Sequence, residues 1–317
     1  MKLHLLTFSY PKNPDSSTRK SIDYMVEAAR VRGHELVVID AKTCKMKFNN
    51  DARVLVNNKF PKINVLIVKS AFGGDKIDIH MSLIKQFELM NIPVVNESQA
   101  VTNARNKLTT LQILSINKIP TPKTYVVRSS EFVEEVVQKI GSYPVILKSV
   151  SGSQGIGVSI IESRRGLRSI VDMLVEQEYS LPVIIQEYVR EAKGKDLRVF
   201  VVGGKIVAAM ERVAQKKDEF RSNFSLGGKV RIANLSTKEK NIALKATKVC
   251  GLDFAGVDVI RTKEGPKILE VNANPGLEGI TLATGVDVAG HIIDYALTKV
   301  KEKPKTKLKK VGKKKRG

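Results

Sequence analysis

The sequence predicts a chain of two parts, a parallel α/β domain followed by an α+β region with antiparallel strands. Over residues 1–95, short apolar segments with the spacing of strands alternate with amphipathic helical segments, which is the pattern of a parallel sheet crossed by helices. After about residue 120, strand-like segments follow one another across tight turns, as at Gly203-Gly204. A length of 317 residues gives room for two or three domains.

The composition is that of an ordinary globular protein, with 42% hydrophobic and 27% charged residues. No apolar run approaches the length that crosses a bilayer, and the first residues lack a signal-peptide pattern, so we expect no membrane segment. Cys44 and Cys250 lie far apart, and neither belongs to a CxxC motif. This pattern favours a reducing, cytoplasmic location and argues against a disulfide framework or a structural zinc site.

Charge and histidine usage narrow the classes of function. The four histidines are scattered, so no histidine-based metal cluster or nucleophile triad is evident, which argues against a hydrolase. The net charge of +22 predicts an anionic partner, such as a nucleotide, an acidic peptide or RNA. Residues 301–317 contain ten basic residues, one acidic residue and no apolar periodicity, so we expect a disordered basic tail.

The first domain is predicted to be a scaffold that contributes one wall of a substrate site. It carries no GxGxxG motif, and Ser16-Ser17-Thr18 lacks the glycines of a phosphate-binding P-loop, so a nucleotide-binding role is not expected here. The predicted strands and helices are Leu3–Phe8, Ser17–Arg32, Glu35–Asp40, Asn64–Ser70 and Ile79–Met90.

Two lysines and a glycine-rich segment are candidates for phosphate contacts. Lys107 lies in a predicted helix, Ser98–Asn117, where the alternative is a solvated helix face. Lys148 ends the otherwise apolar strand Tyr143–Ser149, a position where lysine is uncommon unless it reaches a counter-charge. Ser149–Gly157 then holds three glycines and three serines between two strands, so its backbone N–H groups can close over phosphates. A plain flexible hairpin is the alternative for this segment.

The next region predicts a nucleotide pocket and a functional loop. The strand Pro182–Val189 begins apolar and ends in Gln186-Glu187-Tyr188, as expected where a chain emerges at an adenine pocket. Ala214–Lys229 is a long charged loop that contains Phe220-Arg-Ser-Asn223. Loops of this length inside a compact domain are usually functional or disordered.

The most informative stretch is residues 253–274, DFAGVDVIRTKEGPKILEVNAN. Two strand-like runs flank a Lys-Glu-Gly-Pro turn and predict a β-hairpin. Alternation along the second strand puts Glu270 and Asn272 on one face and Leu269 and Val271 on the other, with Asp258 mid-strand on the partner. Two carboxylates and an amide oxygen converging on one sheet face suit Mg²⁺. The alternative is that the carboxylates are ordinary solvent-facing strand residues.

The order of these features along the chain is the order in which ATP-grasp ligases use such groups. The chain resembles the RimK-type α-L-glutamate ligases of that superfamily from residue 1 to about 298. The most specific segments are KSVSGSQGIGV, QEYVREAKGKDLRVFVVG, EFRSN and GVDVIRTKEGPKILEVNANPGLEGI. The related lysine-biosynthesis ligases carry a different sequence after the metal-binding Asn and are a weaker match.

The resemblance implies an ATP-grasp fold preceded by a Rossmann-like pre-ATP-grasp domain. Residues 1–95 would form the pre-ATP-grasp domain, and 96–185 the small or lid domain, with the linker helix and the glycine-rich hairpin. Residues 186–300 would form the large domain with the metal site, and 301–317 the disordered tail.

Roles for single residues also follow from the resemblance. The metal ligands would be Asp258, Glu270 and Asn272. The adenosine contacts would be Gln186, Glu187 and Tyr188 for the adenine and Asp196 for the ribose. The phosphate contacts would be Lys107, Lys148 and the glycine-rich residues Gly152, Ser153, Gly155 and Gly157. The residues at the acyl-phosphate and amino-acid end would be Arg221 and Asn223, with Arg198, Arg212 and Arg221 as candidates to hold carboxylates.

The implied reaction needs ATP and two Mg²⁺ ions, for which Mn²⁺ can substitute. ATP converts an acceptor carboxylate to an acyl phosphate, and the amine of L-glutamate then displaces phosphate to form an amide. The implied acceptor is an acidic peptide or the C-terminus of a ribosomal protein, and the basic tail would contact RNA or the ribosome. A homo-oligomer is expected.

Two other functions compete with this one. The first is an ATP-grasp ligase that adds an amino acid to a small coenzyme or carrier, which would share every catalytic residue named above. The second is a nucleic-acid-binding protein that uses the basic tail and an inactive ligase fold. Against the second, the tail lacks the interleaved aromatic residues that stack on bases.

Overall fold

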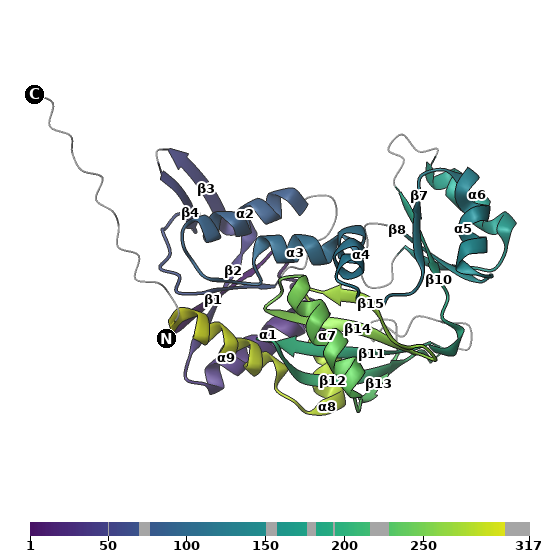
Figure 1. The fold of residues 1–317 in the computed structure, drawn as a ribbon. Helices are drawn as coiled ribbons and strands as arrows, with labels where there is room; N and C mark the ends of the chain where they lie inside the picture. The colour runs from purple at the N-terminus through teal and green to yellow at the C-terminus, as the bar shows by residue number, and fades with distance from the viewer. Residues whose placement is uncertain are drawn as a thin grey trace, which may run out of the picture.

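Figure 1 shows the fold in the computed structural model, which describes residues 1–49, 51–69, 77–149, 157–175, 182–192, 194–215 and 228–301. Within these residues the strands form three larger sheets and one separate hairpin. The larger sheets occupy residues 2–95, 124–187 and 195–272. The division into domains at residues 95, 185 and 300 remains a prediction.

The first sheet is parallel and has the strand order β2-β1-β5-β6. β1 pairs in parallel with β2 and β5, and β5 pairs in parallel with β6. β5 is buried along its whole length, as a near-continuous apolar run in a parallel sheet requires. The predicted α/β domain is therefore confirmed. Its main elements are β1 (Lys2–Thr7), α1 (Ser17–Val31), β2 (Glu35–Asp40), β5 (Leu66–Lys69), α2 (Ile77–Leu89) and β6 (Val94–Val95).

A two-stranded antiparallel hairpin, β3 (Cys44–Asn49) with β4 (Asp51–Val56), projects from this domain (Figure 1). This hairpin was not expected from the sequence, because its Lys-Met-Lys-Phe alternation is short. Met46 pairs with the fully buried Val54, so one face of the hairpin packs inward. The residues on either side of Met46 are exposed lysines.

The second sheet is antiparallel, has the order β7-β10-β8-β9 and is covered by α5 and α6 (Figure 1). Its apolar side chains and those of the two helices form a core of their own. The elements are β7 (Thr124–Val127), α5 (Val133–Ile140), β8 (Val145–Ser149), β9 (Val158–Ile161), α6 (Arg164–Val175) and β10 (Val183–Glu187).

The third sheet is antiparallel, with the order β13-β12-β11-β14-β15. One face packs against α7 and α3 (Ser98–Arg105). The other packs, through Phe200, Met210 and Phe254, into the core that also contains α1 and the C-terminal helix α9. The elements are β11 (Lys195–Val202), β12 (Lys205–Val213), β13 (Lys229–Ile232), α7 (Thr237–Val249), β14 (Phe254–Thr262), β15 (Gly265–Asn272), α8 (Glu278–Thr284) and α9 (Val288–Lys301).

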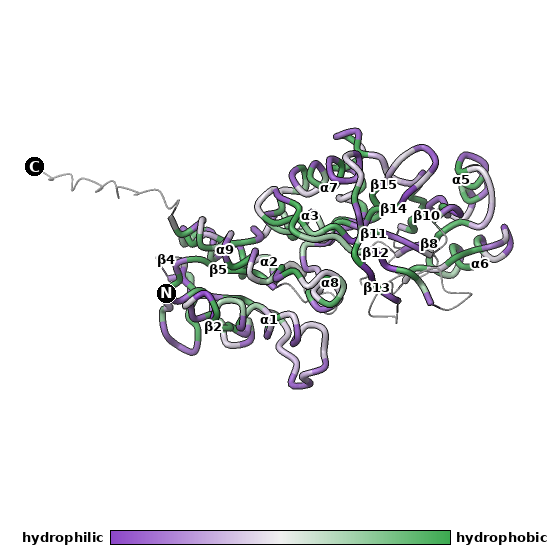
Figure 2. Tube along the Cα trace, turned by 90° about the horizontal axis from the view of Figure 1, so that it is seen from below, coloured by the Kyte–Doolittle hydropathy of each residue, from purple (hydrophilic) through white to green (hydrophobic). Residues whose placement is uncertain are grey.

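Polarity changes along this third sheet. Figure 2 shows β11, β12 and β14 turning from hydrophobic to hydrophilic towards the end that faces β8 and β10. The chain enters β11 at this end, directly after the passage from β10. The polar end of the large sheet therefore faces the second sheet.

One local prediction was wrong. The expected helix Ser98–Asn117 is broken at Asn106 into α3 (Ser98–Arg105) and α4 (Lys107–Ile116), because Asn106 is extended and caps the second helix. The short strand β13 begins at Lys229, where the predicted Ala214–Lys229 loop ends, and residues 216–227 of that loop lie outside the described residues. The helix α8 follows the turn after β15. Among the described residues, no helix has both the length and the apolar character needed to cross a membrane.

Candidate active site

One face of the five-stranded sheet carries the predicted metal ligands. β14 and β15 pair so that Asp258 lies opposite Glu270 and Gly256 lies opposite Asn272. Because side chains at paired positions share a face, the two carboxylates and the amide lie on the same side of the sheet. β11 continues this face, with Arg198 paired to Asp258.

A β-bulge in β15 sets the register behind these ligands. The pairing shifts after Asp258, so that Val259 pairs with Ile268. Ile268 and Val271 are buried, whereas Leu269 is only partly buried. The predicted placement of Leu269 with Val271 on the apolar face is therefore wrong, since the bulge inserts one extra residue into the strand.

Asp258 is buried and bound by two arginines. Arg198 donates to both carboxylate oxygens, with Nη2 2.9 Å from Oδ2, and Arg212 Nη2 lies 2.8 Å from Oδ2. Burial by itself raises the pKa of this carboxyl, but the two guanidinium groups outweigh burial and hold the pKa below its ordinary value. Asp258 is therefore an anion whose charge is already compensated.

Arg212 also binds Asp196, with Nε 2.7 Å from Oδ1 and Nη2 2.5 Å from Oδ2. Burial opposes the charge on Arg212, but Asp258 and Asp196 raise its pKa. These four side chains, Asp196, Arg198, Arg212 and Asp258, are each at most 8% exposed and form what we call the Asp258 network. Arg198 and Arg212 were expected as candidates to hold carboxylates of a substrate. In this structure they bind the carboxylates of Asp258 and Asp196. The ribose contact of Asp196 stays a prediction.

Two lysines from separate elements are coupled to Glu270. Lys107 is the first residue of α4, where Asn106 accepts a hydrogen bond from the Thr109 N–H at 3.0 Å. Burial lowers the pKa of Lys107, and Glu270 opposes that effect. Burial lowers the pKa of Lys148 to about 8, with Glu270 again opposing and Lys107 adding to the reduction. The fold thus brings Lys148 of β8 and Lys107 of α4 close enough to Glu270 of β15 to interact with its charge.

Gln186 fixes the end of the Lys148 side chain. Lys148 Nζ donates to Gln186 Oε1 at 2.7 Å, and Gln186 Nε2 donates to Thr124 Oγ1 at 2.7 Å. β10, which carries Gln186, lies between β7 and β8, so one side chain links three strands. The adenine contact expected of Gln186 stays a prediction.

Glu187 and Tyr188 lie where the chain passes from the second sheet to the third (Figure 1). The Lys123 N–H donates to Glu187 Oε2 at 3.1 Å, and the Glu187 N–H donates to the Lys123 carbonyl at 2.8 Å. Lys267 Nζ lies 3.7 Å from the same carboxylate. Tyr188 is partly buried. These contacts hold the connection between the two sheets in place.

The loop after β15 is attached to the N-terminal domain. The Asn274 N–H donates to Asn272 Oδ1 at 2.8 Å, which orients the amide. Lys69, at the end of β5, is 3% exposed and donates from Nζ to the Pro275 carbonyl at 2.7 Å. Burial lowers the pKa of Lys69 to about 7. The sequence analysis missed Lys69, although it ends an apolar strand just as Lys148 does.

Gly256 makes room for this arrangement. A Cβ atom on Gly256 would lie 2.8 Å from Arg198 Cδ and 2.8 Å from Pro275 Cβ. The absence of a side chain therefore lets Arg198 reach Asp258 beneath the Pro275 loop.

Part of the predicted site lies outside the described residues: Gly152, Ser153, Gly155, Arg221 and Asn223. Gly157 is described and has φ +74°. The Ser149 N–H donates to its carbonyl at 3.0 Å, which closes the base of the glycine-rich segment. Within the described ranges, no cluster of three or more His, Cys, Asp or Glu side chains could hold a metal. The predicted metal site is not a cluster of this kind, because its three ligands are two carboxylates and one amide.

Comparison with known families decides the identity of the fold. A family model described as the RimK-like ATP-grasp domain matches residues 104–296, and one described as the RimK pre-ATP-grasp domain matches residues 13–101. The chain belongs to the RimK-like ATP-grasp family. It has the predicted ATP-grasp fold with an N-terminal pre-ATP-grasp domain, and it is an ATP-dependent ligase.

Two curated relatives are both named probable alpha-L-glutamate ligase. The chain is 38% identical over 296 residues to a probable alpha-L-glutamate ligase of Aliivibrio salmonicida, covering 93% of this chain and 95% of the relative. It is 40% identical over 280 residues to a probable alpha-L-glutamate ligase of Serratia proteamaculans, covering 88% and 92%. The predicted resemblance to the RimK-type ligases is therefore confirmed.

Solved structures share the fold at low sequence identity. The ATP-grasp ligase PsnB, complexed with a minimal precursor, has a TM-score of 0.72 at 20% identity, covering 93% of this chain and 98% of that one. D-alanine–D-alanine ligase from Bacillus anthracis, complexed with ATP, has a TM-score of 0.68 at 18% identity, covering 96% and 99%.

Proposed function

We propose that this ligase attaches L-glutamate to a carboxylate of a peptide acceptor at the expense of ATP. The observation that carries the proposal is the meeting of opposite charges around Glu270: Asp258 and Asn272 share its sheet face, and Lys107 and Lys148 are coupled to it. A set of oxygen ligands next to paired lysines suits the transfer of a phosphoryl group. The names of the curated relatives support glutamate as the amino acid.

The donor set fits Mg²⁺. Asp258, Glu270 and Asn272 offer only oxygen atoms, and hard cations prefer such ligands. Because Asp258 stays ionised despite burial, it would be ready to bind a cation without first losing a proton. We propose two Mg²⁺ ions, replaceable by Mn²⁺, whose chemistry is to neutralise charge on the phosphate oxygens.

The ATP phosphates would be held by the two lysines and the glycine-rich segment. Lys148 is desolvated and keeps its position through Gln186, so its charge would act in a low-dielectric setting. Gln186, Glu187 and Tyr188 would line the adenine pocket, and Asp196 would meet the ribose. PsnB has been solved with AMPPNP and with Mg and ADP, which supports the same ligands here.

The chemistry would proceed through an acyl phosphate. The acceptor carboxylate attacks the γ-phosphorus of ATP, the bond to the β-phosphate oxygen breaks and ADP leaves. The amine of glutamate then attacks the acyl carbon, loses a proton and expels phosphate. Arg221 and Asn223 would hold the groups that react in this second step, and Arg198, which Asp258 holds in place, would also take part. No covalent enzyme intermediate is needed.

A peptide acceptor is favoured over a small molecule. PsnB has been solved with its precursor peptide, and a Chryseobacterium gregarium ligase of similar fold has been solved with a leader and core peptide. We propose an acidic peptide, most simply the C-terminus of a ribosomal protein, with the tail over 301–317 contacting RNA or the ribosome. A cytoplasmic location and a homo-oligomer complete this proposal.

One experiment tests the reaction directly. The protein is incubated with ATP, Mg²⁺, each amino acid in turn and a cell extract, and mass spectrometry records which molecules gain mass. We expect increments of one glutamyl residue on a protein or peptide. Glutamyl increments confined to a small carrier molecule would instead support the coenzyme ligase, and transfer of another amino acid would refute glutamate as the substrate.

A further inference from the structure

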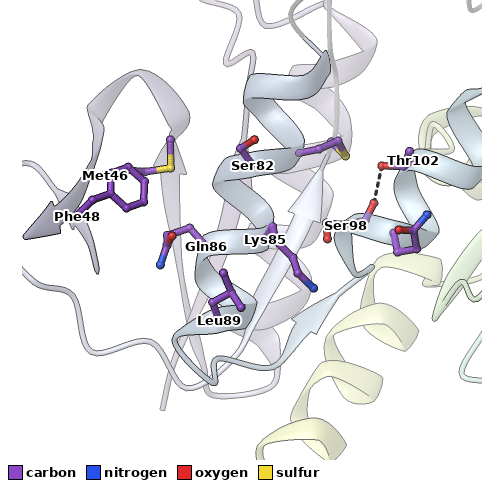
Figure 3. A pocket seen from close by; sticks show the side chains of 10 residues that line it. Met46, Phe48, Ser82, Lys85, Gln86, Leu89, Ser98 and Thr102 are labelled. Carbon is purple, nitrogen blue, oxygen red and sulfur yellow. Dashed lines mark hydrogen bonds between the residues drawn. The ribbon is translucent and has the colours of Figure 1, made fainter. Parts of the chain in front are cut away.

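A groove of about 520 Å³ crosses the exposed face of α2, between the β3–β4 hairpin and α3 (Figure 3). Met46 and Phe48 of the hairpin face α2 on one side, and Leu89 of α2 closes one end. Phe48 is 66% exposed and Leu89 is 64% exposed. Apolar side chains gathered around an exposed hollow are suited to bury an apolar side chain from a partner.

The groove also contains an unused hydrogen-bond donor. Gln86 is 5% exposed, yet its Nε2 has no acceptor among the described residues. Figure 3 shows its amide on the side of α2 that faces Met46 and Phe48. A buried donor without a partner costs free energy, so a carbonyl group placed in the groove would be stabilised there. Backbone carbonyls are what an extended peptide offers.

The surroundings of the groove are basic. Residues 41–62 contain six basic residues and one acidic residue. Lys45 and Lys47 alternate with the apolar groove residues and are exposed on the other face of the hairpin. They lie within a few residues of the groove, so an acidic ligand would feel them over a screening length of about 8 Å. This charge attracts an anionic partner.

The nearby carboxylates do not cancel this attraction. Glu88 lies behind the groove, where it accepts hydrogen bonds from the Ser98 N–H at 2.5 Å and from Ser98 Oγ at 3.0 Å. Lys85 Nζ lies 3.0 Å from the same carboxylate, and Glu97 also acts on Lys85. Lys85 and the two glutamates leave one net negative charge, whereas Lys45 and Lys47 of the hairpin supply two positive charges, so the net charge around the groove stays positive.

We propose that the α2–hairpin groove docks an acidic, extended segment of the peptide substrate. One apolar side chain of that segment lies against Phe48 and Leu89, one backbone carbonyl accepts from Gln86, and glutamates or aspartates face the hairpin lysines. The peptide's identity as the acceptor rests on the proposed function, but the docking itself does not require catalysis.

Two other occupants fit the surface less well. RNA would need planar stacking partners, and Phe48 is the one aromatic ring in a lining otherwise made of Met, Leu and polar side chains. A second copy of this chain would bring two basic hairpins together, which like-charge repulsion opposes.

The test is a binding measurement on the full-length protein without ATP. The probe is a fluorescein-labelled synthetic peptide in which one leucine is embedded in a run of glutamates, and the readout is fluorescence anisotropy. We expect Leu89→Glu to weaken binding about tenfold or more, because it removes the apolar contact and adds a like charge. Ile79→Glu is the matched control, since Ile79 is also on α2 and also 64% exposed but does not line the groove.

A second matched pair uses aromatic residues. Phe48→Ala should weaken binding several-fold, whereas Phe60→Ala should not, because Phe60 lies outside the groove with Arg53 over its ring. Equal weakening by Leu89→Glu and Ile79→Glu would overturn the groove as the site. Displacement of the peptide by an RNA oligomer that itself depends on Leu89, or loss of a dimer in sedimentation on Leu89→Glu, would assign the groove to RNA or to a second copy.

The docking proposal and the proposed function can fail independently of each other. If the wild-type protein transfers no glutamate but the peptide binds as expected, the docking stands and the proposed function fails. If glutamate is transferred to a peptide with the same KM by wild type and Leu89→Glu, the docking is refuted and the proposed function stands.

Discussion

Asp258 and Glu270 lie opposite each other on neighbouring strands, but their surroundings differ. Asp258 is buried and binds two arginines, whereas Glu270 is partly exposed and coupled to two lysines. Removing the first leaves the buried Arg198 without its carboxylate partner, although Arg212 keeps Asp196. Removing the second leaves two lysines that are only partly buried. The same substitution should therefore have different consequences at the two positions.

We predict that Glu270→Ala abolishes Mg²⁺-dependent ADP release with little change in thermal stability. Asp258→Ala should also be inactive, but it should lose on the order of 3 kcal/mol of unfolding free energy, since breaking a buried ion pair strands its partner. Urea unfolding of both variants measures their stability, and a Mg²⁺ titration of ADP release measures their activity. Near-normal ADP release by Glu270→Ala would mean that the metal assignment is wrong.

Lys69 gives a pH prediction. Its pKa in the folded state is about 7, below the ordinary value, because its charged form is disfavoured by burial. Below pH 7 both the folded and the unfolded state carry the proton, and stability is lowest. Between pH 7 and about 10.5 the unfolded state binds more protons, so stability rises with pH.

We expect Lys69→Met to remove that rise. The measurement is the free energy of unfolding in urea from pH 6 to pH 9 for wild type and variant. The difference between the two should shift in favour of the wild type as pH increases. A difference that does not change with pH would show that the charge on Lys69 is compensated in the folded protein.

At the scale of elements, the β14–β15 hairpin requires a glycine at position 256, where a side chain would not fit. A Cβ at Gly256 would lie 2.8 Å from both Arg198 and Pro275, whereas a Cβ at Gly276 meets nothing within 4 Å. We predict that Gly256→Ala costs about 1–3 kcal/mol of stability, as overpacking of a close contact does, and reduces ligase activity by displacing Arg198. Gly276→Ala, its matched control in the adjoining loop, should be close to wild type in both thermal unfolding and kinetics. Equal effects of the two would argue against the contact as the cause.

The elements that sequence reasoning found are those with long, clear periods. The hairpin over β14 and β15 and the parallel strands of the first sheet follow directly from apolar runs and turn residues. The break at Asn106 was missed, because an asparagine inside an apolar helical pattern gives no sign that its side chain will cap a second helix. The β3–β4 hairpin was missed because its alternation of lysines with Met46 and Phe48, although it has the period of a strand, spans only a few residues.

The site shows the same division. Alternation placed Glu270 and Asn272 on one face, because the period of a strand is local information. The partners of Asp258 could not be read in the same way: Arg198 and Arg212 come from two other strands, and their pairing depends on register across the sheet. β11 and β14 are not joined by a turn that would set their register, so alternation within each strand does not show which residues face each other.

At the scale of the whole molecule, the net charge of +22 gives a salt prediction. Removing residues 302–317, which hold nine basic residues and one acidic residue, should weaken RNA or ribosome binding and flatten its salt dependence. The log–log slope changes by about 0.7 to 0.9 for each phosphate that the protein no longer neutralises. Filter binding from low to moderate salt measures the slope, with ADP release on a short peptide as the control. Unchanged ribosome affinity would mean that the segment only increases solubility.

The separation of the hydrophobic cores determines which properties of the enzyme a substitution can alter independently. The first and third sheets share one hydrophobic core through α1 and α9, whereas the second sheet and its helices have a core of their own. The molecule therefore consists of one large cooperative unit and one small one, joined by the passage from β10 to β11. With the proposed ATP contacts of Lys148 and Gln186, substitutions in the small unit would alter nucleotide affinity without lowering the melting temperature of the large unit. Nucleotide affinity and thermal stability would then be two quantities that selection can adjust separately.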